Sequence, residues 1–129
     1  SSSAASDVYK RQKPDRLIPV PLHRKKERRR GFNQSAYIAE QLSLLTGIPC
    51  DGEIVKKCRN TKSQKKLNAQ ERRNNLKNAF IIRKNVKDLT LLIIDDVYTT
   101  GSTMDEISAC LMAGGAKKVY FLTLCMGNP

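Results

Sequence analysis

The amino-acid sequence predicts an α/β fold built around a mostly parallel, twisted sheet with flanking helices. The main observation is the unbroken aliphatic run Leu91–Ile94, which is typical of a strand buried on both faces. A second observation is that short apolar strands alternate with stretches of helical period, an order that favours parallel strands joined by helices. At 129 residues the chain is expected to form one small domain with a single core.

The first part of the chain predicts a tail, a strand and a helix. Residues 1–14 are expected to form a disordered tail, either native or a residue of cloning or sequence assembly, and residues 15–129 the domain. A short strand at residues 17–20 leads into a proline-constrained turn. A helix then begins at Asn33 or Ser35 and ends at Gly47. Its inward face is expected to consist of Ile38, Leu42 and Leu45.

The second part predicts four strands and a second helix. Strands are expected at residues 54–55, 79–82, 91–94 and 119–124. The polar, basic stretch 58–78 is long enough to indicate a functional or disordered loop. A capping box, Thr103-x-x-Glu106, predicts that the helix starts close to Thr103, and the glycine pair at 114–115 ends it. The helix should face inward through Met104, Ile107 and Leu111.

The charge of the chain indicates an anionic partner. Lysine and arginine number 24 against 12 acidic residues, which gives a formal net charge of +12. Such an excess predicts a polyphosphate metabolite, nucleic acid or both. Aromatic content of 5% and the absence of Trp argue against a surface that stacks single-stranded bases.

Cysteine usage and hydropathy indicate a cytoplasmic protein without a zinc site. No apolar run approaches the roughly 20 residues of a membrane span, and no signal-peptide pattern opens the chain. The single histidine, His23, and the absence of a Cys-x-x-Cys pair make a zinc site improbable. Reduced thiols are therefore expected at Cys50, Cys58, Cys110 and Cys125.

The richest segment for function follows the aliphatic run. Asp95 and Asp96 come where that strand is expected to end, and ligands of open α/β sheets bind at the carboxyl ends of strands. The next residues are small and hydroxylated and lead into a helix, which is typical of a phosphate site: Thr99, Thr100, Gly101, Ser102 and Thr103. Because carboxylates accept hydrogen bonds from sugar hydroxyls, the whole segment suits a ribose 5-phosphate.

Two other classes of protein contain similar strands. In response-regulator receiver domains a pair of acids also follows a strand, but near the N-terminus, with a phosphoacceptor Asp and a Lys still to come. A Walker B strand would need a Gly-x-x-x-x-Gly-Lys-Ser/Thr loop upstream, which this sequence lacks. The ribose-phosphate interpretation is therefore favoured.

Three segments resemble a known family. The row Leu91–Thr103 closely resembles the signature of type I phosphoribosyltransferases that binds phosphoribosyl pyrophosphate (PRPP). The segments Val20–His23 and Arg28–Gln34 resemble the Pro-x-Pro…Arg-Gly-Phe-Asn-Gln pattern of the ComF/GntX family, and the spacing from Arg59 to Phe80 is also similar. Some members of that family are linked to natural competence and DNA uptake.

The resemblance implies a type I phosphoribosyltransferase fold with a mobile loop, and a role for each segment. Asp95 and Asp96 would be the catalytic pair that holds the ribose hydroxyls, and the loop 99–103 would wrap the 5-phosphate. Pyrophosphate would lie on the loop after the first strand, at Pro21, Leu22, His23 and Arg24. The mobile loop would contact ligand through Arg59, Gln64 and Arg72.

The implied reaction is transfer of phosphoribosyl to an unidentified base or amine with release of pyrophosphate. Mg²⁺ would be bound mainly through PRPP itself, with no direct metal ligand from the protein. The alternative is a non-catalytic PRPP-binding accessory protein of competence and DNA uptake. The basic run from Arg24 to Arg30 fits a phosphate role, a solvated loop or a weak nucleic-acid-binding patch.

The sequence departs from the family at its N-terminal side. Full-length members carry a cysteine-rich zinc module and a helix before the first strand, and this sequence has neither, as expected of a truncated fragment. The sheet face that the helix would cover would then be exposed or used for a homodimer.

Overall fold

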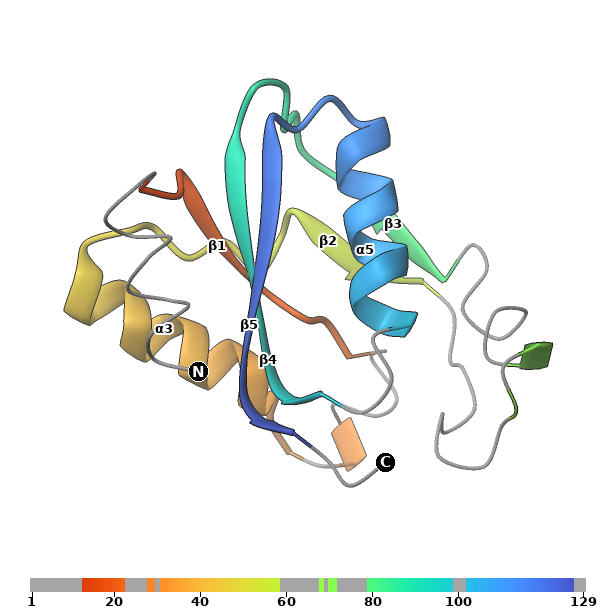
Figure 1. The fold of residues 1–129 in the computed structure, drawn as a ribbon. Helices are drawn as coiled ribbons and strands as arrows, with labels where there is room; N and C mark the ends of the chain where they lie inside the picture. The colour runs from red at the N-terminus through yellow and green to blue at the C-terminus, as the bar shows by residue number, and fades with distance from the viewer. Residues whose placement is uncertain are drawn as a thin grey trace.

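The computed structural model describes residues 13–22, 28–29, 31–58, 68, 70–71, 79–98 and 102–126. In this part of the chain a parallel sheet lies between two helices, α3 (Gln34–Thr46) on one face and α5 (Ser102–Ala113) on the other (Figure 1). The sheet has the strand order β1 (Arg16–Pro19), β4 (Thr90–Tyr98), β5 (Lys118–Met126). The predicted α/β class with a parallel sheet and flanking helices is confirmed.

The aliphatic run is the centre of the sheet. Leu92 pairs with Leu17 of β1 on one side and with Tyr120 of β5 on the other. Successive residues of the run point to opposite faces, so Leu91 and Ile93 pack under α5 while their neighbours pack under α3. All four side chains are at most 7% exposed. A strand covered on both faces has no polar side to alternate with, which explains the unbroken apolar run.

Strand β4 is longer than predicted. It does not end before the carboxylates but continues to Tyr98, because β5 keeps pairing with it. Asp95 is paired with Thr123, and the pairing extends as far as Tyr98 and Met126. Asp95 and Asp96 therefore lie within a hydrogen-bonded strand, a more rigid setting than a strand end.

Two of the predicted strands do not enter the parallel sheet. β2 (Val55–Lys57) and β3 (Phe80–Ile82) pair with each other, antiparallel, in a separate two-stranded sheet. The sequence predicted them as members of one mostly parallel sheet, and this is corrected. The chain leaves along β2 and returns along β3 after the 58–78 segment, so the two strands meet side by side in opposite directions.

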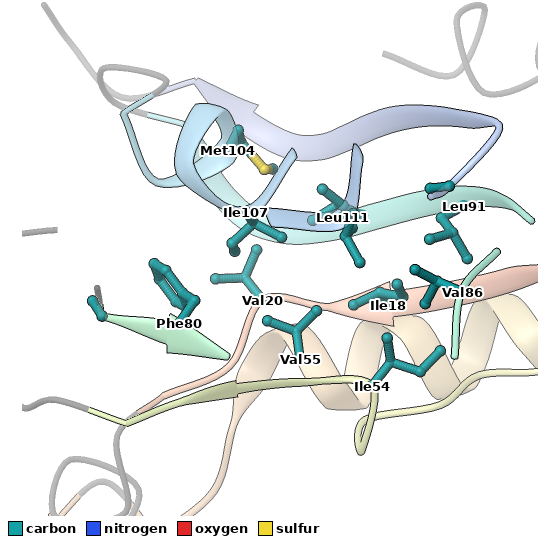
Figure 2. Close-up of a cluster of buried hydrophobic side chains, with 13 residues drawn as sticks. Ile18, Val20, Ile54, Val55, Phe80, Val86, Leu91, Met104, Ile107 and Leu111 are labelled. Atoms are coloured by element: carbon teal, nitrogen blue, oxygen red, sulfur yellow. The ribbon is translucent and has the colours of Figure 1, made fainter. Parts of the chain in front are cut away.

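The larger of the two cores lies between the sheet, α5 and the small antiparallel sheet. Figure 2 shows Met104, Ile107 and Leu111 pointing from α5 toward Ile18 and Val20. The predicted inward face of this helix is confirmed, since its three residues are at most 2% exposed. The helix begins at Ser102, one residue before the predicted start. It ends at the glycine pair, as predicted, and Gly115 has a φ of 95° that favours glycine.

The second core lies under α3. Asn33 caps the start of this helix and Gly47, with a φ of 77°, caps its end, as the sequence predicted. The predicted inward face was wrong for Leu45, whose side chain is 83% exposed. Ile38 and Leu42 do pack against this core, and the fully buried positions are Ser35 and Ala39. Leu45 lies about 240° around the helix from Ala39 and therefore faces away from the sheet.

Other sequence expectations fall on parts of the chain outside the described residues. The predicted tail is one of these over residues 1–12, and the predicted mobile loop is another over most of residues 59–78. Among the residues that the structure describes, no helix has the length and apolar character needed to cross a bilayer.

Candidate functional site

The carboxylate pair lies in the carboxyl-terminal half of the central strand, β4. Because β1 and β4 are parallel, the segment that follows β1 emerges at this same edge of the sheet. That segment starts with Pro21 and Leu22, two of the residues predicted to border pyrophosphate. The fold thus brings the segment predicted to bind ribose and the start of the segment predicted to hold pyrophosphate to one edge of the sheet, although they lie far apart in the sequence.

The start of α3 reaches the carboxylate pair directly. The Ser35 hydroxyl donates a hydrogen bond to Oδ1 of Asp95 over 3.2 Å, between residues 60 positions apart in the sequence. The backbone N–H of Asp96 donates to the same oxygen over 2.8 Å. Ser35 is only 4% exposed. Two donors on one oxygen fix the orientation of the Asp95 carboxylate.

The electrostatics of the pair raise the pKa of Asp95. Burial of Asp95, together with a side-chain hydrogen bond and the charge of Asp96, raises the pKa of Asp95 from its ordinary 3.8 to about 6. The hydrogen bonds from Ser35 and from the Asp96 backbone act against this rise and lower the pKa. Perturbed carboxylates of this kind cluster at functional sites, although structural pairs also produce them.

Asn33 joins the start of the segment predicted to hold pyrophosphate to the start of α3. Its side-chain Nδ2 donates to the carbonyl of Val20 over 3.1 Å, where the segment begins. Its Oδ1 accepts from the N–H of Ala36 over 3.2 Å, where α3 begins. Val20 is itself tied to β4, because its N–H donates to the carbonyl of Ile94 over 2.8 Å. One amide side chain therefore links the end of β1 to the start of α3 at the edge of the sheet.

A small pocket lies beside Asn33. Its volume is about 180 Å³, and it is bordered by the residues that follow β1, by the start of α3 and by the connection into β2. An exposed ion pair between Lys56 and Glu53, with 3.1 Å between Nζ and Oε1, lies at the pocket. The lining residues are Pro19, Pro21, Leu22, Asn33, Ala36, Gly52, Glu53 and Lys56.

The structure places some of the predicted site residues and leaves others outside its description. Asp95 and Asp96 lie on β4, Ser102 and Thr103 begin α5, and Pro21 and Leu22 follow β1. The exposed Arg28 and Arg29 belong to the basic run. The remaining predicted site residues fall outside the described residues: His23, Arg24, Arg59, Gln64, Arg72, Thr99, Thr100 and Gly101.

Sequence reasoning assigned Asn33 and Ser35 only as alternative helix starts and missed their contacts at the site. Their position could have indicated these contacts, because Asn33 and Ser35 are polar residues at the end of the Arg-Gly-Phe-Asn-Gln segment, where the predicted helix starts. Within the described ranges, no group of three or more His, Cys, Asp or Glu side chains is placed to hold a metal ion.

Comparison with solved structures gives the class of fold. The chain is similar to a purine phosphoribosyltransferase from Pyrococcus horikoshii, with a TM-score of 0.58 and 21% identity, over 96% of this chain and 68% of that one. It is also similar to a phosphoribosylpyrophosphate synthetase from Mycobacterium smegmatis, with a TM-score of 0.59 and 16% identity, over 99% of this chain and 34% of that one. At these identities the likeness shows the fold alone, the type I phosphoribosyltransferase fold.

Sequence comparison then gives the family. Residues 28–129 match the phosphoribosyl transferase domain. The chain is 42% identical over 114 residues to the DNA utilization protein YhgH of Salmonella typhimurium, covering 88% of this chain and 50% of that protein. It is 38% identical to Competence protein F of Haemophilus influenzae, over 89% of this chain and 52% of that protein. The chain belongs to the phosphoribosyl transferase domain family, as a ComF-like type I member.

A more distant relative agrees with this placement. The chain is 34% identical to Competence protein ComFC of Bacillus subtilis, over 95% of this chain and 49% of that protein. The chain thus spans about half the length of the relatives it matches.

Proposed function

We propose that this chain binds PRPP and transfers its phosphoribosyl group to a base or amine, releasing pyrophosphate. The observation that carries the proposal is the carboxylate pair, Asp95 and Asp96, with Asp95 held in orientation, in the carboxyl-terminal half of the central strand of a phosphoribosyl transferase domain. Ligands of open parallel sheets bind at this edge. The excess of positive charge, +12, suits a ligand with several phosphates.

In the proposed mechanism the carboxylates act on the ribose. They accept hydrogen bonds from its hydroxyls and offset the positive charge that develops on the sugar as pyrophosphate leaves. The residues from Thr99 to Thr103 hold the 5-phosphate at the start of α5, so binding energy far from the reacting carbon positions that carbon. Pyrophosphate is held after β1, at Pro21 to Arg24, and the loop with Arg59, Gln64 and Arg72 excludes water.

The residues at the site fit a Mg²⁺ ion that arrives with PRPP. Within the described residues the site holds no group of three or more side chains placed to bind a metal ion. Mg²⁺ keeps several waters and is bound largely by substrate phosphates, so PRPP and water would supply its ligands while Asp95 and Asp96 act on the ribose hydroxyls. When bound, the ion would neutralise charge on the departing pyrophosphate.

The first test is whether PRPP with Mg²⁺ stabilises the folded chain. At about 100 times its dissociation constant, PRPP should raise the free energy of unfolding by roughly 2.7 kcal/mol. The measurement is thermal unfolding with and without ligand. Asp96→Asn should lose most of the shift, while Asp88→Asn, which changes an exposed carboxylate in a left-handed turn where Asn is well tolerated, should keep it.

Turnover is tested separately by following pyrophosphate release with a panel of nucleobases and amines. Release that depends on one acceptor would support the transferase. A folded wild-type chain whose melting temperature does not respond to saturating PRPP would contradict the proposal at its first step.

A second candidate function is that of an accessory protein in DNA handling that binds PRPP without turnover. Two observations favour it: relatives bear the names DNA utilization protein and competence protein, and Arg28 and Arg29 are exposed. Each phosphate contact with duplex DNA should add a slope of about −0.9 to log affinity against log salt. We expect millimolar PRPP to displace a short duplex, because both anions would use the same basic segment. Tight, salt-sensitive DNA binding that millimolar PRPP does not displace would favour the accessory protein over the transferase.

A further inference from the structure

We propose that Ser35 is a positioning residue for the ribose-binding carboxylate, acting through Asp95 rather than on the ligand. This inference rests on the proposed function. It starts from one contact, the 3.2 Å hydrogen bond that the buried Ser35 hydroxyl donates to Oδ1 of Asp95.

The helix does not need this serine. A serine in the first turn of a helix usually serves as its cap, but here Asn33 already caps α3 by accepting the N–H of Ala36. Alanine would be the better helix former at position 35. A buried hydroxyl is also costly unless it is hydrogen-bonded, and its partner here lies on β4. The reason for a serine at this position is therefore its contact with Asp95.

The chemistry of the contact fits a carboxylate that must accept hydrogen bonds from sugar hydroxyls. Burial and the neighbouring Asp96 raise the pKa of Asp95, whereas the Ser35 hydroxyl stabilises its charged form and lowers the pKa. On the described elements around Asp95, α3 supplies Ser35 and β5 places the uncharged Thr123 opposite. Asp96, on β4 itself, is the titratable group acting on it. Ser35 thus keeps Asp95 ionised and oriented near neutral pH.

The contact also joins two parts of the candidate site. Ser35 lies two residues after Asn33, whose side chain donates a hydrogen bond to Val20 at the start of the segment predicted to hold pyrophosphate. The start of α3 therefore contacts both Asp95, the carboxylate proposed to bind ribose, and Val20, where the segment predicted to hold pyrophosphate starts. The position of α3 thus sets the distance between these two parts of the site.

The test compares Ser35→Ala with Ser43→Ala in the full chain. Ser43 is a matched control, since it lies in the same helix and donates a side-chain hydrogen bond to the Ile48 carbonyl over 2.6 Å, at the end remote from the carboxylates. Two quantities are measured across pH 5–8: PRPP affinity with Mg²⁺, and the pKa of the Asp95 carboxyl by ¹³C NMR. The NMR measurement needs no ligand.

For Ser35→Ala we expect PRPP affinity at neutral pH to fall by about 2- to 12-fold, the equivalent of one net hydrogen bond. The Asp95 titration and the pH midpoint of binding should both move to higher pH. Asp96→Asn should move the Asp95 titration to lower pH, and Ser43→Ala should move neither. Ser35→Cys nearly preserves volume but donates weakly, so it should follow Ser35→Ala even where the alanine variant does not fold.

The failure of this inference and that of the proposed function have different signatures. Unchanged Asp95 titration in both Ser35→Ala and Ser35→Cys would overturn the positioning role, whatever their stability. If the variants show the expected shifts in the Asp95 titration but the wild-type protein does not bind PRPP, the proposed function is overturned. The positioning of Asp95 by Ser35 would still stand.

Discussion

The two halves of β4 differ in what they contribute to the molecule. Residues Leu91–Ile94 are buried on both faces and carry the two cores. Asp95 and Asp96, on the same strand, place two acids side by side in a partly buried position. The first half stabilises the fold and the second half costs stability. A strand whose first half is fully buried can thus carry, in its second half, an acid whose ionised form is disfavoured by burial and by a neighbouring carboxylate.

The largest effect is expected in the aliphatic half. Ile93→Ala removes a side chain that is 0% exposed and should lower the free energy of unfolding by about 2–5 kcal/mol, because it leaves a cavity at the centre of the sheet. Urea denaturation measures the loss. Ile81→Ala is the matched control, since Ile81 is 45% exposed on β3 and its truncation should cost far less. Equal losses at the two positions would contradict the central role of the run.

A smaller effect of opposite sign is expected in the acidic half. The folded chain holds the pKa of Asp95 at about 6 rather than 3.8, so it binds a proton more tightly than the unfolded chain does. Stability therefore falls as pH rises between these two values, and the full penalty is present above about pH 6. Asp95→Asn should remove the penalty and raise stability at pH 8 by on the order of 1–2 kcal/mol, once solvent screening is allowed for.

The gain from Asp95→Asn should disappear as the pH is lowered below 4, where the wild-type carboxyl is protonated in both states. Asp88→Asn, which removes an exposed carboxylate, controls for the lost negative charge. A loss of stability in Asp95→Asn at pH 8 would mean that the carboxylate stabilises the fold instead.

The sequence predicted the central features because local patterns determine them. The aliphatic run required cover on both faces, the period of α5 determined its inward residues, and the glycine pair ended that helix. The carboxylates and the hydroxyl-rich row were recognisable for the same reason: their chemistry and their spacing lie within one short segment, Leu91–Thr103.

The features that the sequence did not predict depend on contacts between distant residues. The periodicity of β2 and β3 indicates strands but not their partners, so it does not show that they leave the parallel sheet. Leu45 and Leu42 look alike as helical leucines, and only the close approach of α3 at Ala39 decides which of them packs. Ser35 contacts Asp95 across 60 positions, a separation that no local pattern records.

The amide of Asn33 has a consequence for which substitutions this edge of the domain tolerates. Its Nδ2 donates to the carbonyl of Val20 and its Oδ1 accepts from the N–H of Ala36, so both of its polar groups are used at once. Aspartate at this position would keep the acceptor and lose the donor, and alanine would lose both. The position of α3 beside the edge of the sheet thus depends on the chemistry of a single amide.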